Sequence, residues 1–314
     1  MNDVTKLLKK NYINISKFSS KDEEEFYKFL KKSDINNKAF ENNWPYILQA
    51  TRNRHYKFYY RDSIVFFTLR FKKSNKNFIV VVNFLGKERN EAVLELCNIL
   101  KKNNINVLIK NIDKKEIYFW KKQGFIESIK PWSRYSFRDD NTFPQHILSR
   151  DIIKLRTFSR GYMRLFRKFE KENIITESYK TKNDFLTNEL LHKNANFLYA
   201  KGVDKKEEVI GAHLFFFDNN VKNKIRLQHI RNKKLIGVSY LTLINDVAFG
   251  NALFCKKEKD IMKYLAYEGM MYVINNYQKI KFFSIQGSEN KGQNFFKKRF
   301  NPIISIEKTH LILS

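Results

Sequence analysis

Hydrophobic residues in the first half of the chain follow two spacings. Compact runs of branched and aromatic side chains, which are typical of β-strands, occupy residues 63–71, 77–84 and 105–109. Apolar residues three and four positions apart predict amphipathic helices over residues 22–31, 91–101 and 114–122. The polar residues between the first two runs predict a hairpin, Gly124 suits a helix C-terminus, and a further strand is expected near residues 132–137.

The second half of the chain repeats this order. Strands are predicted over residues 197–200, 209–217, 225–230 and 282–286, helices over 260–277 and 292–300, and a final strand or hairpin over 303–313. The apolar stretch 238–254 fits either a strand or a helix. One basic helix is predicted over about residues 151–171, with Gly161 as a point for a break or kink. We therefore expect an α+β chain with a first domain at 1–145 and a second at 146–314, opened by the basic helix.

Composition places the chain among folded globular proteins. Of its 314 residues, 43% are hydrophobic and 15% aromatic, and only 4 are Pro and 10 are Gly. Disordered and collagen-like classes are excluded by these values. Neither a signal-peptide core nor a run of about 18 apolar residues is found, which predicts no transmembrane segment. We expect a cytoplasmic protein and leave open a peripheral position at the inner membrane surface.

The chain carries a formal net charge of +28, from 60 Lys and Arg against 32 Asp and Glu. Such an excess is typical of proteins that bind nucleic acid, anionic membranes or phosphate-bearing substrates. A lysine-rich background from A/T-rich codons explains part of the same excess. Both explanations stay open from the charge alone.

The cysteines and histidines predict no metal site. Cys97 and Cys255 are far apart in the chain, and the six His residues do not cluster with them. We therefore expect a reduced protein without a permanently bound cofactor.

Two aromatic-basic clusters mark corresponding short helices, Phe-Trp-Lys-Lys-Gln-Gly-Phe at 119–125 and Phe-Phe-Lys-Lys-Arg-Phe-Asn-Pro at 295–302. They occur together with Trp44-Pro45, the basic residues 155–169, and Gln-Gly-Ser-Glu at 286–289 followed by Gly292. In this order the motifs resemble two tandem acyltransferase folds of the GCN5-related type. More narrowly, they resemble the catalytic region of phosphatidylglycerol lysyltransferases and the Fem family of aminoacyl-tRNA-dependent transferases. The resemblance covers nearly the whole chain and implies mixed, mostly antiparallel sheets flanked by helices.

The resemblance implies transfer of an acyl or aminoacyl group to an amine or hydroxyl, with aminoacyl-tRNA as the preferred donor. Acyl-CoA-dependent N-acyltransfer is one alternative, and a non-catalytic double fold that binds RNA or an anionic surface is another. A glycine-rich turn that would bind the pyrophosphate of coenzyme A is not evident in the sequence. The two candidate segments, 84–89 and 250–252, contain one Gly each. The acceptor stays open among small molecules, lipids and peptides.

Three residues are candidates for the chemistry. Lys297 occupies the Phe-Lys position of the resembled motif and would stabilise the developing oxyanion. Asp246, within an apolar run, and Glu289, after the predicted strand 282–286, are candidate proton acceptors. Each residue also has a structural alternative: Lys297 as a surface lysine, Asp246 as a turn residue and Glu289 as a helix-capping charge.

A basic row is the candidate donor or phosphate site. Its members are Arg156, Arg160, Arg164 and Arg167, about one helical turn apart, with Lys298 and Arg299 near the chain's end. A solvated helix between the domains is the alternative. His213 and His229, in predicted strands, are expected to be structural.

Overall fold

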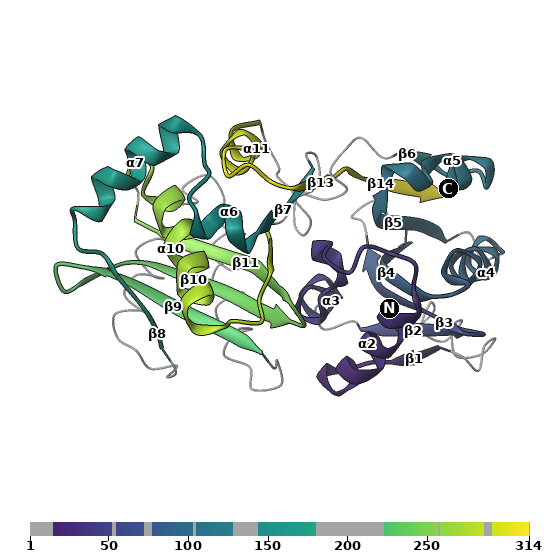
Figure 1. Ribbon diagram of the computed structural model, residues 1–314. Helices are drawn as coiled ribbons and strands as arrows, with labels where there is room; N and C mark the ends of the chain where they lie inside the picture. The colour runs from purple at the N-terminus through teal and green to yellow at the C-terminus, as the bar shows by residue number, and fades with distance from the viewer. Residues whose placement is uncertain are drawn as a thin grey trace. The chain divides into compact units, whose positions relative to one another are not determined.

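The computed structural model describes residues 15–51, 55–71, 77–102, 105–127, 144–179, 223–256, 258–285 and 291–313. The strands expected near 132–137, 197–200 and 209–217 lie outside these ranges, as do His213 and Glu289. The chain forms two compact units, Met1–Asn141 with Glu307–Ser314, and Thr142–Ile306 (Figure 1). Each unit is built on a seven-stranded mixed sheet, which confirms the α+β class.

The first unit has the strand order β1-β2-β3-β4-β5-β14-β6. Its strands are β1 (Ile15–Lys17), β2 (Tyr56–Tyr60), β3 (Ser63–Phe71), β4 (Asn77–Gly86), β5 (Asn106–Asp113), β6 (Ile126–Glu127) and β14 (Lys308–Leu313). Its helices are η1 (Ser20–Asp22), α2 (Glu23–Lys32), η2 (Phe40–Asn42), α3 (Trp44–Thr51), α4 (Arg89–Lys101), η3 (Lys114–Glu116) and α5 (Ile117–Lys122). All neighbouring strands are antiparallel except β4 and β5, which are parallel.

Helices pack on both faces of the first sheet. On one face, α4 and α5 bury Leu96, Leu100 and Trp120 against the strands. On the other, Phe26 of α2 and Trp44 of α3 meet Phe66 of β3, with ring centroids 5.7 and 5.8 Å away. The predicted helices 22–31, 91–101 and 114–122 and strands 63–71 and 77–84 are thus confirmed within one or two residues, except that η3 forms the first three residues of 114–122.

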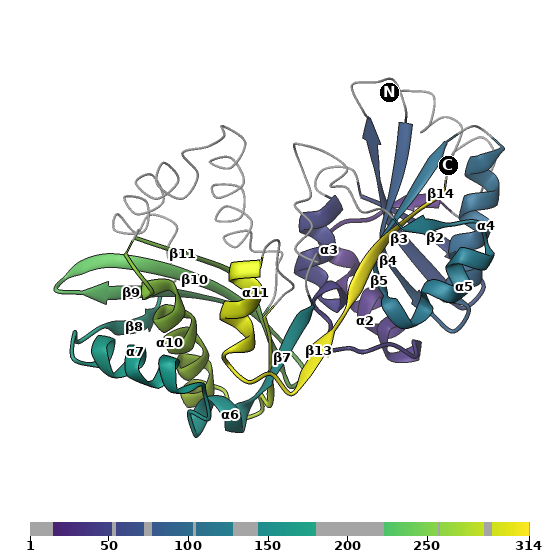
Figure 2. The same cartoon turned by 90° about the horizontal axis from the view of Figure 1, so that it is seen from above.

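The end of the chain differs from the prediction. Residues 303–313 do not form one hairpin: β13 (Ile304–Ile306) pairs with β7 in the second unit, and β14 pairs with β5 and β6 in the first. Figure 2 shows β14, in yellow, among the strands of the first unit. The first unit therefore includes the chain's last strand, which the boundaries 1–145 and 146–314 had placed in the second domain.

The second unit has the strand order β13-β7-β12-β11-β10-β9-β8. Its other strands are β7 (Gln145–Ser149), β8 (Ile175–Ser178), β9 (Lys224–Arg231), β10 (Lys234–Ile244), β11 (Val247–Cys255) and β12 (Phe282–Ser284). Its described helices are α6 (Arg150–Lys154), α7 (Arg160–Glu170), α10 (Ile261–Asn276) and α11 (Lys291–Lys298). Phe166 of α7 and Leu265 of α10 belong to one buried core with Phe283 of β12.

The apolar stretch 238–254 is a β-hairpin. β10 and β11 pair antiparallel along their length and are joined at Asn245 and Asp246. Asn245 has a φ of +55°, a conformation that asparagine adopts more readily than most residues. The position of Asp246 within an apolar run thus reflects the turn between two buried strands.

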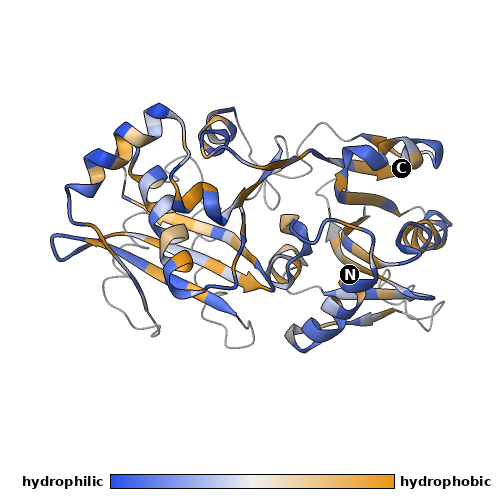
Figure 3. Ribbon diagram, viewed as in Figure 1, coloured by the Kyte–Doolittle hydropathy of each residue, from blue (hydrophilic) through white to orange (hydrophobic). Residues whose placement is uncertain are grey.

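The predicted basic helix 151–171 is two helices rather than one. The chain leaves α6 after Lys154 and enters α7 at Arg160, and Arg156 between them has a φ of +55°. Gly161, the expected break, lies in the first turn of α7. Arg150 belongs to the structure of the unit, because its guanidinium donates to the carbonyls of Ile274, Tyr277, Gln278 and Ile280 at the end of α10. Figure 3 shows α7 as largely hydrophilic beside the more hydrophobic strands.

Candidate functional site

Two neighbouring parallel strands part in the middle of the second sheet. β12 pairs with the first three residues of β11, Val247 to Phe249, and among the described strands only β10 pairs with the rest of β11. Just past this point, Tyr240 of β10 faces Ala252 while Leu241 faces Gly250, so Asn251 is an extra residue in β11. A β-bulge interrupts the ladder and redirects backbone groups, and bulges are common beside active sites.

The first unit repeats this arrangement. β4 and β5 pair only from Phe78 to Val81, and the register of β4 against β3 shifts immediately afterwards, with Val82 as the extra residue. Each unit therefore has a bulge where its central parallel strands part.

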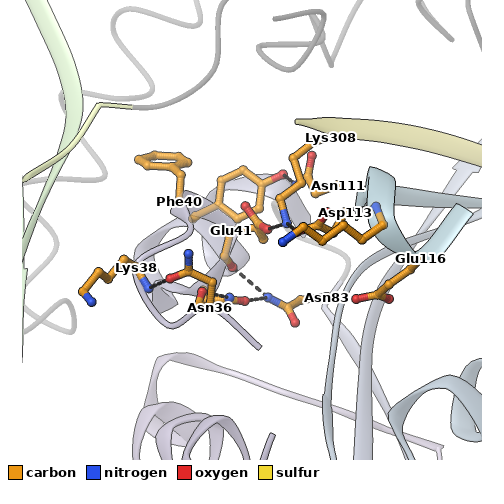
Figure 4. A network of polar contacts seen from close by, with 12 residues as sticks. Asn36, Lys38, Phe40, Glu41, Asn83, Asn111, Asp113, Glu116 and Lys308 are labelled. Carbon is orange, nitrogen blue, oxygen red and sulfur yellow. Dashed lines mark hydrogen bonds and ion pairs between the residues drawn. The ribbon is translucent and has the colours of Figure 1, made fainter. Parts of the chain in front are cut away.

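Side chains of the first unit bridge its parting strands (Figure 4). Asn83 of β4 donates to the backbone carbonyl of Glu41 at 2.7 Å, and Asn111 of β5 donates to the hydroxyl of Tyr46 at 2.7 Å. Nζ of Lys308, on β14, lies 2.7 Å from Oε1 of Glu41, and both side chains are more than nine-tenths buried. Because η2 is bonded to β4 and α3 is bonded to β5, the side chains between these two strands form a closed polar network.

The second unit places different groups at its parting. Ser284, the last residue of β12, is fully buried, and its hydroxyl has no hydrogen-bond partner among the described residues. Gly250 lies opposite, where a β-carbon would be 3.7 Å from the carbonyl oxygen of Ser284. This site therefore has a buried hydroxyl and little side-chain bulk on β11.

His146 of β7 links the sheet to α11 at the same end. Its carbonyl accepts from the amide of Ile285, which follows β12. Its Nε2 lies 2.8 Å from Oδ1 of Asn294 and its Nδ1 lies 2.9 Å from Oγ of Ser305. Burial, and then the charges of Lys297 and Lys298, lower the pKa of His146, while the contact with Asn294 opposes them. The lowered pKa favours a neutral imidazole. This imidazole contacts α11 at Asn294, about one turn before Lys297.

Lys297 and Asp246 lie at opposite ends of β12. Lys297 is half-buried on α11, close enough to influence His146. The carbonyl of Asp246 instead accepts from the amides of Lys281 and Phe282, where β12 begins. At about 3.3 Å per strand residue, the two ends are roughly 10 Å apart. The structure therefore does not bring this predicted pair together, and Asp246 has the position of its structural alternative, a turn residue.

The predicted arginine row divides into two groups. Arg156 bonds to Glu170, and its guanidinium lies 5.3 Å from the ring centre of Tyr267, so it holds the link between α6 and α7. Arg156 therefore precedes α7 and is already ion-paired, so it is separate from the arginines that α7 exposes. Arg160, Arg164 and Arg167 are exposed on α7, and none of them has an ion-pair partner among the described residues.

The beginning of α7 meets the end of α11. The Tyr162 hydroxyl donates to the carbonyl of Phe296 at 2.7 Å, and the Ser159 amide donates to the carbonyl of Arg299 at 3.3 Å. A β-carbon at Gly161 would lie 3.2 Å from Nη1 of Arg299. Glycine thus lets Arg299 approach α7, and the two predicted basic segments form one surface.

His146, Asn294 and Ser284 were missed by sequence reasoning. His146 has no neighbouring motif in the sequence, and its bond to Asn294 spans 148 positions. His229 is structural as expected: it is fully buried between Ser239 and Thr176.

No group of three or more His, Cys, Asp and Glu that could hold a metal occurs in the described ranges. Burial raises the pKa of Cys97 and Cys255 to about 12, so neither thiol is a nucleophile. Over the same ranges, no helix has the length and apolar character needed to cross a membrane.

No known family profile matches the sequence, and no curated protein matches it. A conserved protein of unknown function from Bacteroides thetaiotaomicron has a TM-score of 0.69 and 14% identity, covering 96% of this chain and 100% of its own. L-PGS from Bacillus licheniformis has a TM-score of 0.60 and 13% identity, covering 92% and 90%. A tandem GNAT protein from the clavulanic acid biosynthesis pathway has a TM-score of 0.56 and 8% identity, covering 95% and 97%. The chain thus has the tandem fold of GCN5-related acyltransferases, as its repeated order predicted.

Proposed function

We propose that the second unit transfers an acyl group, with aminoacyl-tRNA as donor and an amine or hydroxyl as acceptor. The observation that carries the proposal is that β12 stops pairing with β11 beside the bulge at Asn251. Helix α11 places Lys297 near His146, at this same end of β12. A redirected backbone amide and a cation are the groups needed to stabilise an oxyanion.

The reaction itself needs little from the protein, because an aminoacyl ester is already activated. The acceptor attacks the ester carbonyl, the terminal ribose hydroxyl leaves, and one proton passes from the acceptor to the leaving oxygen. Orientation of the two substrates supplies much of the rate. Glu289, two positions before α11, stays the predicted proton acceptor.

The strand-to-helix loops argue against coenzyme A. Residues 256–260 between β11 and α10 contain no glycine, and their acids Glu258 and Asp260 are ion-paired with Arg231 and Lys263. In the first unit, Gly86 is required by its own turn, since its φ is +113° and a β-carbon would lie 2.2 Å from the carbonyl oxygen of Asp62. Neither loop offers the glycine-rich cradle that suits a pyrophosphate.

The exposed face of α7 supports a polyanionic donor. Arg160, Arg164 and Arg167 extend over about 10 Å of helix, at 1.5 Å per residue. Such a row is longer than one pyrophosphate and suits successive phosphates of a nucleic-acid strand.

The donor is tested by measuring the affinity for coenzyme A and for charged tRNA at several salt concentrations. We expect tRNA to bind with a steep salt dependence, and replacement of Arg160, Arg164 and Arg167 by Gln to reduce the slope by about 2 to 3. The matched control replaces Lys21, Lys28 and Lys31 by Gln, which removes the same charge from the first unit. Tight binding of coenzyme A without a preference for charged tRNA would contradict the proposal.

A further inference from the structure

The two corresponding helices α5 and α11 each present an exposed aromatic ring covered by a cation. Tyr118 is 71% exposed, and Nζ of Lys122 lies 4.5 Å from its ring centre. Phe295 is 59% exposed, and the guanidinium carbon of Arg299 lies 4.4 Å from its ring centre. The aromatic-cation pair on α5 can therefore be compared with the similar pair on α11.

Three cations around α5 are each paired with a carboxylate. Arg89 lies 2.6 Å from Glu116, and Lys121 lies 2.7 Å from Glu127. Lys114, just before α5, lies 2.8 Å from Glu307. A phosphate approaching this helix would have to compete with the protein's own acids.

Three cations around α11 have no such partner in the described part of the chain. Lys298, Arg299 and the neighbouring Arg160 have no carboxylate partner among the described residues. Arg299 nevertheless has aromatic contacts, because its guanidinium carbon lies 4.4 Å from the ring centre of Phe295 and 5.9 Å from that of Tyr162. A half-exposed ring and the guanidinium that lies over it are therefore next to Lys298 and Arg160, which have no carboxylate partner among the described residues.

We propose that Phe295 and Arg299 form a stacking site for the unpaired base at the 3′ end of an RNA donor, with Lys298 and Arg160 binding its phosphates. The site rests on the proposed function and specifies how the donor would be held. Unpaired bases stack on aromatic rings and on guanidinium planes, and basic side chains bind the backbone that follows. The continuation of the cations along α7 favours an RNA strand over the single adenine and pyrophosphate of coenzyme A.

The test uses an uncharged RNA hairpin with a single-stranded ACCA 3′ end whose last adenine is replaced by 2-aminopurine. Stacking on the full-length protein quenches the fluorescence of this base. We expect Phe295→Ala to abolish the quenching and to weaken binding about tenfold, whereas Phe295→Trp retains both. Tyr118→Ala is the matched control and leaves both unchanged. Because Phe295 is exposed, its replacement should leave the fold intact. Circular dichroism melts check that each variant is folded.

Failure of the hairpin to bind, binding without quenching, or equal quenching by wild type and Phe295→Ala would overturn the site. Quenching of etheno-coenzyme A that depends on Phe295, in place of the hairpin, would assign the ring to coenzyme A and also overturn it. Since the hairpin is uncharged, Phe295-dependent quenching without any transfer from charged tRNA would support the site and contradict the proposed function. If Phe295→Ala transfers from charged tRNA at the wild-type rate, that result would support the proposed function and contradict the stacking site.

Discussion

His229 shows how a single buried side chain links folding to pH. Its imidazole is fully buried under α10, with Nε2 2.7 Å from Oγ of Ser239 and Nδ1 2.8 Å from Oγ1 of Thr176. Gly269 of α10 faces this group, and a β-carbon there would lie 3.7 Å from Oγ of Ser239, at van der Waals contact. Desolvation lowers the pKa of His229 from 6.5 to about 3.

The second unit should therefore lose stability in acid. Below pH 6.5 the unfolded chain binds a proton at His229 that the folded chain does not, so the free energy of unfolding falls as pH falls toward 3. The loss from this group approaches about 1.4 kcal/mol per pH unit. Urea unfolding between pH 7.5 and 4.5, followed by circular dichroism, measures this slope. His229→Gln should flatten it, and an unchanged slope in that variant would contradict the account.

At the scale of elements, the last strand of the chain completes the first sheet. β14 lies between β5 and β6, and it brings Lys308 against Glu41 inside the closed polar network. A buried charge that loses its partner costs far more than an exposed one. The C-terminal strand therefore contributes a charge as well as backbone hydrogen bonds to the first unit.

Lys308→Met should lower the free energy of unfolding of the first unit by about 3 to 5 kcal/mol, because the buried carboxylate of Glu41 loses its ion pair with Lys308. Adding Glu41→Gln should restore much of the loss. Lys114→Ala, which breaks the exposed pair with Glu307, should cost less than about 1 kcal/mol.

Trp44 and Trp120 are fully buried in the first unit, so tryptophan fluorescence in urea reports its unfolding. If Lys308→Met unfolds at the same urea concentration as wild type, the buried pair does not stabilise this unit.

At the scale of the whole molecule, the repeated order of helices and strands was predictable because it depends on local periodicity. The partner of a strand does not depend on local periodicity. Residues 308–313 end in an apolar Leu-Ile-Leu run, but nothing local indicates that β5 and β6 are their neighbours. The break in the basic helix was expected at Gly161 but lies before Arg160, because distant contacts such as Asn301 with Thr157 fix its position.

The candidate site was predictable in part. The Phe-Lys motif located α11 and Lys297, and the basic pattern located α7. Asp246 was chosen because an acid in an apolar run is costly to bury, yet a two-residue turn between buried strands produces the same pattern. His146 was missed because its role depends on a contact with Asn294 that only the folded chain creates.

The most direct test of the account is the rate of transfer from a pool of tRNA charged with labelled amino acids to a small amine, with Lys297→Ala compared with wild type. We expect kcat to fall about 100-fold or more if Lys297 stabilises the oxyanion. Lys121→Ala, at the corresponding helix of the first unit, should leave kcat unchanged. Transfer by Lys297→Ala at the wild-type rate, or an equal loss in Lys121→Ala, would contradict catalysis at the parting of β11 and β12.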